Sequence, residues 1–267
     1  MMTPAVALTI AGSDSGGGAG IQADLRTFAF HRVHGTSALT CVTAQNTLGV
    51  SQVVALSPEM VSAQLEAIAS DIGVQAVKTG MLLNREITQM VATQVKKLRL
   101  QPLVVDPVMV SRTGAQLLDD TAIAALRDEL LPLATVVTPN RYEAQILSQR
   151  EITTLADMEA AARSIYDQGV PAVLIKGGGL RGELCGVDVW FAGDRPEILK
   201  TAYIDTPHTH GTGCTLSAAI AANLALGTDL FPAVQRAKLY VTQALEHSLA
   251  IGSGSGPVGH FFPLLTP

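Results

Sequence analysis

Short apolar runs alternate with longer segments of helical spacing over most of this chain. Apolar runs of about five residues favour strands, and the longer periodic segments between them favour helices. A succession of this kind predicts repeated βαβ units, and therefore an α/β fold built on a mostly parallel sheet. The predicted strands are residues 6–10 (VALTI), 37–44 (SALTCVTA), 76–80 (AVKTG), 102–106 (PLVVD), 134–138 (ATVVT) and 172–176 (AVLIK).

Two of the intervening helices carry start and stop signals. Ser57 and Pro58 open a helical segment that ends before Gly73, which is the expected order of a capping residue, a first-turn proline and a terminating glycine. Thr154 precedes Asp157 by three residues, which is the spacing of a capping box. These signals agree with the periodicity and support the βαβ prediction.

The pattern changes after Lys176. Two alternating segments flank the turn residues 193–196, which predicts an antiparallel hairpin at one edge of the sheet. A helix rich in small residues follows at 211–227, and a second helix at about 232–249. The glycine-rich tail GSGSGPVGH is predicted to be mobile. Because no other stretch has the composition of a linker, residues 1–267 are predicted to form one domain.

Composition and charge narrow the classes of function. Hydrophobic residues make up 48% of the 267 positions, which is enough for a large core. The net charge of -5 is spread without long runs, which argues against a nucleic-acid surface or a polybasic membrane anchor. The cysteines, Cys41, Cys185 and Cys214, are too scattered for a disulfide framework, and no secretory signal or membrane-spanning run is recognisable. We therefore expect a cytoplasmic protein.

Polar side chains follow several of the predicted strands directly. These are Asp14, Asp106, Asn140 with Glu143 one turn later, and Lys176. Because the carboxyl ends of parallel strands lie at one edge of a sheet, the groups are expected to converge on a single crevice. Each alone has an ordinary structural explanation, as a turn residue, a helix cap, a first-turn acid or a solvated lysine. Their joint occurrence favours a functional site.

The stretch DTPHTHGTGCTLSAA predicts an anion site. Gly211 and Gly213 let the backbone curl so that the first amides of the following helix face one point, as a phosphate requires. Cys214 lies at that helix N-terminus, where the dipole favours a thiolate, although a small buried cysteine is the ordinary alternative. His208 and His210 have no third ligand nearby in the sequence and are interpreted as polar loop residues, not as metal ligands.

The glycine cluster in AGSDSGGGAGIQAD marks either a turn shaped for close contact with a ligand or a tight connection without one. Neither this cluster nor the later glycine-rich loops complete a known nucleotide-binding motif. A P-loop is excluded because Lys176 precedes its glycines, and GxGxxG is excluded because Leu216 occupies the third glycine position after Gly211 and Gly213.

Seven motifs, in this order, resemble those of the hydroxymethylpyrimidine/phosphomethylpyrimidine kinases of thiamine biosynthesis, within the ribokinase-like superfamily. They are AGSDSGGGAGIQADL, VTAQNT, VKTGML, VVDPVM, TPNRYEA, IKGG and HGTGCTLSAAIA. The resemblance covers nearly the whole chain. It implies a single kinase domain with a three-layer α/β/α fold, ATP and Mg²⁺ as cofactors, and phosphorylation of 4-amino-5-hydroxymethyl-2-methylpyrimidine and then of its monophosphate. We also expect a homodimer.

The resemblance also implies roles for individual residues. Gln45 is expected to bond the ring nitrogen and amino group of the pyrimidine, for which a carboxamide has the matching donor and acceptor. The other expected acceptor contacts are Gly12, Ala19, Asp24 and Val108. The metal is expected at Asp106, Asn140 and Glu143, and the nucleotide at Lys176, Asn140, Thr212 and Gly213. The expected catalytic residues are Lys176, Gly211, Gly213 and Cys214.

Three questions stay open at this point. Cys214 stands where sugar kinases of the superfamily place an aspartate base, and it could be a base, part of a phosphate cradle or a pocket wall. We predict that Cys214→Ser selectively loses the first phosphorylation, as a base role requires, because the monophosphate acceptor already carries a negative charge. A pyridoxal or pyridoxine kinase is the nearest alternative function, because that vitamin also carries a hydroxymethyl group on a heteroaromatic ring. A non-catalytic ligand sensor is a third candidate, although sensing alone would not require the phosphate-binding residues.

Overall fold

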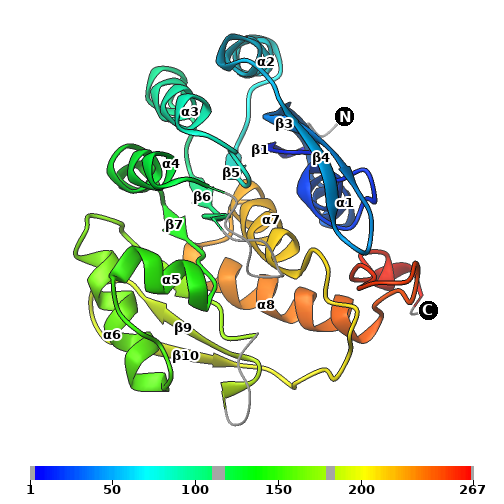
Figure 1. Ribbon diagram of the computed structural model, residues 1–267, viewed down its shortest axis with the longest axis vertical. Helices are drawn as coiled ribbons and strands as arrows, with labels where there is room; N and C mark the ends of the chain where they lie inside the picture. Colours follow the sequence, from blue (N-terminus) through cyan, green and yellow to red (C-terminus); the bar gives the residue numbers. More distant parts are fainter. Residues whose placement is uncertain (1–3, 110–117, 179–183, 266–267) are drawn as a thin grey trace.

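The computed structural model describes residues 4–109, 118–178 and 184–265, and Figure 1 shows their arrangement. The strands are β1 (Val6–Ala11), β2 (His34–Leu39), β3 (Cys41–Gln45), β4 (Val50–Ala55), β5 (Ala76–Thr79), β6 (Leu103–Val105), β7 (Val136–Val137), β8 (Val173–Ile175), β9 (Val187–Phe191) and β10 (Glu197–Lys200). The helices are α1 (Gly20–Phe30), α2 (Pro58–Asp71), α3 (Arg85–Leu98), α4 (Asp120–Ala125), α5 (Arg141–Ser148), α6 (Leu155–Tyr166), α7 (Thr212–Ala225) and α8 (Leu230–Glu246). Shorter helical turns follow α4 at Leu126–Leu130 and Leu131–Leu133 and end the described chain at Phe262–Leu264.

Eight of the described strands form one sheet in the order β10-β9-β8-β7-β6-β5-β1-β2. The pairs from β2 to β8 are parallel, while β9 is antiparallel to both β8 and β10. The predicted parallel sheet with an antiparallel hairpin at its edge is therefore confirmed. Because β6, β7 and β8 are neighbours, their carboxyl ends lie side by side.

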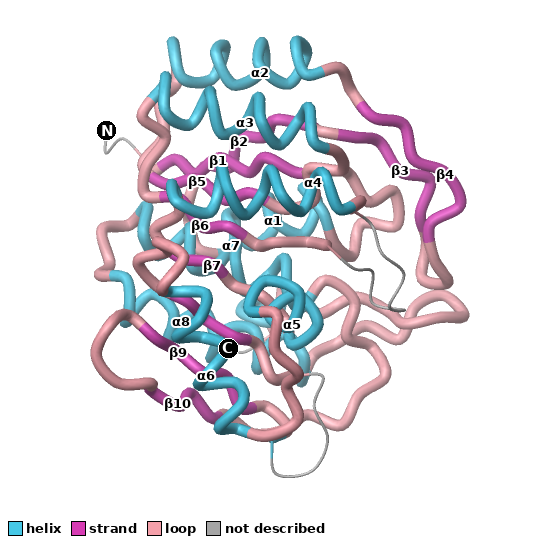
Figure 2. The backbone as a smooth tube through the Cα atoms, turned by 60° about the vertical axis from the view of Figure 1, so that its left-hand side comes forward, coloured by secondary structure: helices cyan, strands magenta, loops and turns pink. Residues whose placement is uncertain are grey.

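Helices cover both faces of this sheet, which gives three layers. Figures 1 and 2 show α2, α3, α4 and α6 on one face and α1, α7 and α8 on the other. The alternation of side chains along each strand builds a separate core for each face. Along β1, for example, Leu8 and Ile10 belong to the core beneath α2 and α3, whereas Ala7 packs on the side of α1 and α7.

The helix signals in the sequence act as predicted. The Ser57 hydroxyl accepts a hydrogen bond from the amide of Met60 at the start of α2. Thr154 and Asp157 form a reciprocal capping box at the start of α6. Helix α7 buries ten residues, most of them Ala or other small residues, so it packs closely against the sheet and α8.

One predicted strand is two strands in the structure. Residues 37–44 break at Thr40, which is fully buried and donates its hydroxyl to the carbonyl of Met81. Strand β2 ends before Thr40 and belongs to the main sheet, whereas β3 pairs with β4, a strand that the sequence analysis did not predict. Figure 2 shows this β3–β4 hairpin extending beyond the main sheet. The chain leaves the sheet at Thr40 because tertiary contacts override the continuous apolar pattern.

The prediction of a mobile tail is wrong, because residues 255–260 are buried. A Cβ atom on Gly256 would lie 1.8 Å from the carbonyl oxygen of Leu249, and one on Gly254 would lie 2.1 Å from that of Thr47. The glycines therefore allow close backbone packing, which the composition alone did not distinguish from flexibility. Figure 1 shows this segment beside the β3–β4 hairpin.

Candidate active site

Three polar side chains meet at the carboxyl ends of β6, β7 and β8, as predicted. Asp106 follows β6, Asn140 follows β7 and Lys176 follows β8. A parallel bridge joins the backbones of Asn140 and Lys176, and Lys176 Nζ lies 2.8 Å from Asp106 Oδ1. Glu143 lies in the first turn of α5 just beyond Asn140. The sheet therefore brings these four groups together at one edge.

The Asp106–Lys176 pair forms the charged centre of this edge. Burial alone would raise the pKa of Asp106, but Lys176 and then Lys78 outweigh burial and lower it. Burial likewise opposes the charge on Lys176, and Asp106 followed by Glu143 raises its pKa. Ser217 of α7 donates to Asp106 Oδ2 at 3.2 Å. Each charge of the pair therefore stabilises the other, and the contact with Ser217 helps to hold Asp106 in place.

Asn140 and Glu143 also fulfil the structural roles considered for them. The Asn140 side chain accepts from the amide of Glu143, and the Glu143 carboxylate accepts from the amide of Asn140, which makes a capping box. Burial raises the pKa of Glu143 to about 7, although Lys176 opposes this shift. Glu143 therefore caps the helix, and because it is also a buried carboxyl beside Asp106 and Lys176, it stays a candidate site residue.

The N-terminus of α7 faces the same edge. Gly211 caps the helix with φ +82°, and a Cβ there would lie 1.8 Å from the carbonyl oxygen of Gly18. A Cβ on Gly213 would lie 3.3 Å from Lys176 Nζ. The Thr212 hydroxyl donates to the carbonyl of Thr209 and so holds the turn. Amides in the first turn of a helix lack partners within the helix, so this turn could offer donors to an anion next to Lys176.

The surroundings of Cys214 disfavour the thiolate that its place at the helix N-terminus suggests. Burial raises the pKa of Cys214 to about 11, although the nearby Lys78 opposes the shift. Loss of solvation therefore disfavours the charged form of this thiol. The raised pKa favours the neutral thiol, which weakens the case for Cys214 as a base and leaves the roles of pocket wall and of anion cradle.

The glycine-rich loop is organised by Asp14. Its carboxylate accepts hydrogen bonds from the amides of Gly16, Gly18 and Ala19 and from His210 Nε2, at distances of 2.8 to 3.0 Å. Burial alone would raise the pKa of Asp14, but His210 and the amides lower it, so Asp14 is ionised. Asp14 thus holds the loop together through its amides, and its contact with His210 joins the loop to the turn that precedes α7.

Gln45 lies at the end of β3, opposite this loop. The Ser15 hydroxyl bonds both the amide and the carbonyl of Gln45, at 2.8 and 2.7 Å. Gly12 lies beneath, where a Cβ would come within 2.5 Å of Cys41 Sγ. Val108 follows Asp106 after β6, where its amide donates to the Asp106 carbonyl. The structure therefore brings Gly12, Ala19 and Gln45 together around the loop.

Asp24 lies apart from these groups, inside the molecule. It is fully buried on α1, and its carboxylate accepts from Lys78 Nζ at 2.8 and 2.9 Å and from Thr9 Oγ1 at 2.6 Å. Burial would lower the pKa of Lys78, but Asp24 outweighs burial and raises it. The structure places Asp24 in an ion pair beneath the site rather than on its surface.

Three residues at or beneath the site escaped functional assignment from the sequence: Lys78, Ser217 and His210. A lysine within the apolar run AVKTG is the one clear signal among them, because a charge inside a buried strand requires a partner. His210 was read as a polar loop residue, and the structure pairs it with Asp14. Among the described residues, no cluster of three or more His, Cys, Asp or Glu could hold a metal ion.

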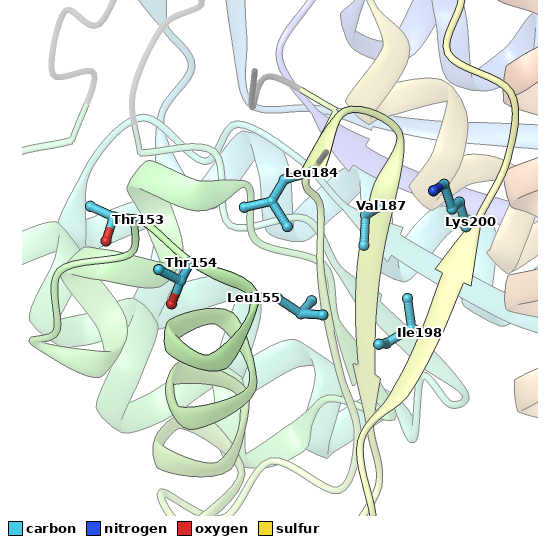
Figure 3. Close-up of a pocket in the computed structure, with 7 residues that line it drawn as sticks. All are labelled: Thr153, Thr154, Leu155, Leu184, Val187, Ile198 and Lys200. Carbon is cyan, nitrogen blue, oxygen red and sulfur yellow. The ribbon is translucent and has the colours of Figure 1, made fainter. Parts of the chain in front are cut away.

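A surface groove of about 600 Å³ lies elsewhere, between the start of α6 and the β9–β10 hairpin. Figure 3 shows its lining, which comes from Thr153, Thr154, Leu155, Leu184, Val187, Ile198 and Lys200. None of the predicted site residues lines this groove. The candidate site is therefore separate from this groove and is defined by its converging polar groups.

Fold and site together define a ribokinase-like kinase for a small molecule. Comparison with known proteins identifies the family: the chain belongs to the phosphomethylpyrimidine kinases, whose family model matches residues 14–259. A hydroxymethylpyrimidine/phosphomethylpyrimidine kinase of Synechococcus elongatus is 65% identical over 263 residues, which cover 98% of this chain and all of that protein. The resemblance read from the seven motifs is therefore confirmed.

Pyridoxal kinases are also close in sequence and structure. A pyridoxine kinase of Bacillus subtilis is 44% identical over 257 residues, covering 95% of each chain. The ADP complex of Bacillus subtilis pyridoxal kinase has a TM-score of 0.92 at 42% identity, covering 99% of this chain and 100% of that one. A phosphomethylpyrimidine kinase from Clostridium difficile has a TM-score of 0.81 at 41% identity, covering 90% and 99%.

Proposed function

We propose that this protein phosphorylates 4-amino-5-hydroxymethyl-2-methylpyrimidine and then its monophosphate, with ATP as the donor. The observation that carries the proposal is the meeting of Lys176, Asp106 and the first turn of α7 at one edge of the sheet, opposite Gln45 and the glycine-rich loop. Phosphoryl transfer needs positioning and neutralisation of charge more than covalent chemistry. Lys176 supplies a cation, and the α7 amides supply donors for charge that develops on the transferred group.

The donor set fits Mg²⁺ that is shared with phosphates. Mg²⁺ usually takes one or two carboxylates and completes its shell with water and substrate phosphates, so a cage of protein ligands is not required. Asp106 and Glu143 are buried neighbours and supply two carboxyl groups. The side-chain oxygen of Asn140 already accepts a hydrogen bond in the capping box. When bound, the ion would neutralise phosphate charge, with Asp106 and Glu143 as the groups that hold it.

The assay that tests the proposal incubates the protein with Mg²⁺ and ATP and one acceptor at a time. The acceptors are the hydroxymethylpyrimidine, its monophosphate, pyridoxal and pyridoxine, and mass spectrometry identifies the products. We expect the pyrimidine mono- and diphosphates. Phosphorylation of pyridoxal or pyridoxine alone would favour a pyridoxal or pyridoxine kinase instead, the activity named for the similar Bacillus subtilis proteins. Binding of a ring without any product would favour a sensor.

Gln45→Ala should weaken binding of the aminopyrimidine and leave binding of ATP unaffected. The carboxamide lies at the end of β3, beside the glycine-rich loop, and is separate from the Asp106–Lys176 pair. Losing its bonds to the ring should raise the KM for the pyrimidine about tenfold or more. Steady-state kinetics with each substrate varied in turn measures both KM values. Equal losses for the two substrates would remove Gln45 from the acceptor pocket.

Cys214→Ser should leave both phosphorylation steps within about tenfold of the wild-type rates, because a neutral thiol and a hydroxyl are both poor bases near neutral pH. The first-turn amides persist in this variant. Single-turnover rates, measured separately with the alcohol and with the monophosphate, check this expectation. A selective loss of the first step would instead restore the base role, since the monophosphate acceptor already carries a negative charge.

We infer a cytoplasmic homodimer with one kinase domain over residues 1–267. No helix in the described ranges is long and apolar enough to span a bilayer, and Cys41, Cys185 and Cys214 form no disulfide, which suits a reducing compartment. A second copy of the chain is the partner that suits the β3–β4 hairpin, whose Val42, Leu48, Val50, Val53 and Val54 are each at least 43% exposed. Sedimentation velocity measures the assembly state.

A further inference from the structure

His210 stands between the glycine-rich loop and Gln45. Its Nε2 lies 2.8 Å from Asp14 Oδ2 and 3.4 Å from Gln45 Nε2. The ring packs on Gly18, where a Cβ would come within 2.3 Å of His210 Cδ2. The tail fixes the backbone of His210 from the other side, through the carbonyl of Gly256 and the amide of Val258. The imidazole is thus held in one place by contacts on two sides.

The protonation of His210 Nε2 follows from its partner. The ionised carboxylate of Asp14 can only accept hydrogen bonds, so His210 Nε2 must carry the proton and donate it. Its one proton is directed at Asp14, the nearer partner, so this nitrogen has no lone pair with which to accept from Gln45. With Gln45 Nε2 facing it, two N–H groups would point at each other, which is unfavourable. A half-turn of the carboxamide places Gln45 Oε1 there instead, where the oxygen faces the positive N–H side of the His210 ring.

The opposite side of the carboxamide leads to the same orientation. Thr43 Oγ1 lies 3.4 Å from Gln45 Oε1 and 2.7 Å from the carbonyl oxygen of Ser13. Threonine has one hydroxyl proton, and the shorter contact to Ser13 takes it. Thr43 can therefore only accept from Gln45, which requires the Gln45 NH₂ group on the Thr43 side. Both neighbours thus select one orientation of the amide.

We propose that His210 is a positioning residue for acceptor recognition: its Nε2–H group, bonded to Asp14, favours the Gln45 oxygen on the His210 side, and Thr43 accepts from the NH₂ group on its own side. The outer edge of the carboxamide then presents one acceptor and one donor in a fixed order. A ring with an exocyclic amino group next to a ring nitrogen pairs with that edge in one direction, with its amino group on the His210 side. This proposal rests on the proposed function, in which Gln45 contacts the ring.

The test uses His210→Phe, which keeps a ring against Gly18 and removes the N–H group. We expect the KM for the aminopyrimidine to rise about tenfold, with kcat and the KM for ATP within twofold of wild type. In the Gln45→Ala background, His210→Phe should not raise the KM for the aminopyrimidine further, because there is no carboxamide left to orient. His210→Gln keeps an N–H donor and should recover most of the lost affinity.

His208→Phe is the matched control, because His208 belongs to the same loop and bonds the amide of Gly256 instead of Asp14. It should leave the KM for the pyrimidine unchanged. Independent effects of His210→Phe and Gln45→Ala would overturn the proposal, as would an equal rise in both KM values. A co-crystal structure with the pyrimidine should show its amino group on the His210 side, and the reverse placement would also overturn it. Failure of the proposed function is distinguishable, since the wild-type protein would then form no pyrimidine phosphate.

Discussion

Lys176→Met is expected to lower kcat by about 10² to 10³, the range found when one donor to transition-state charge is removed. Lys176 is the cation at the end of β8, 2.8 Å from Asp106 and beside Gly213 in the first turn of α7. Methionine keeps much of the volume and removes the charge that the phosphates need. Steady-state kinetics at saturating Mg²⁺ and ATP measures the loss.

The controls for this experiment separate lost chemistry from lost folding. Lys97→Met removes an exposed lysine of α3 that pairs with Glu66, and it should leave kcat unchanged. Lys176→Gln keeps a donor toward Asp106, so it should fold at least as well as Lys176→Met and still lose turnover. Wild-type kcat in Lys176→Met would show that this lysine supports the sheet edge and not the reaction.

The second large effect concerns stability. Lys78→Met should destabilise the protein by about 3 to 5 kcal/mol, because it leaves the Asp24 carboxylate buried without its cation. Both side chains are fully buried, and Lys78 Nζ bonds both Asp24 oxygens. For a domain of this size the expected fall in Tm is roughly 6 to 20 °C. Calorimetry or thermal melting followed by circular dichroism measures it.

Replacing both partners should cost less than replacing one. The double variant Lys78→Met/Asp24→Leu removes the stranded charge and should recover most of the lost Tm. A Tm in the double variant as low as in Lys78→Met would contradict this account of the pair. If Asp24 instead binds the acceptor directly, Asp24→Asn should raise the KM for the pyrimidine strongly with little change in Tm.

Much of the fold was predictable because its signals are local. Apolar runs, the Ser57 cap and the Thr154–Asp157 capping box each depend on neighbours in the sequence, and all three predictions are confirmed. The break at Thr40 was not predictable, because residues 37–44 read as one strand and the contact that ends it is the distant carbonyl of Met81. The tail was misread because its glycines pack against backbone that only the folded chain brings near.

In the site, too, local signals were predictable and contacts between distant residues were not. Asp106 and Lys176 were predicted as neighbours from the rule that parallel strands end at one edge, and that prediction is confirmed. Lys78 and His210 escaped because their partners lie 54 and 196 residues away. For Cys214, the helix N-terminus was visible in the sequence but the degree of burial was not, and burial decides its protonation.

The packing of the tail has a consequence for the order in which the enzyme is made. Synthesis proceeds from the N-terminus, so most of the sheet and the glycine-rich loop exist before residues 254–260 have been added. Yet Gly256 and Val258 fix the backbone of His210, and Gly254 and Ser255 bond Thr47 in the β3–β4 hairpin. A nascent chain that stops short of this segment holds Lys176 and the α7 turn but lacks the brace on its acceptor side. On the proposed role of His210 and Gln45, recognition of the acceptor is among the last properties that the growing polypeptide acquires.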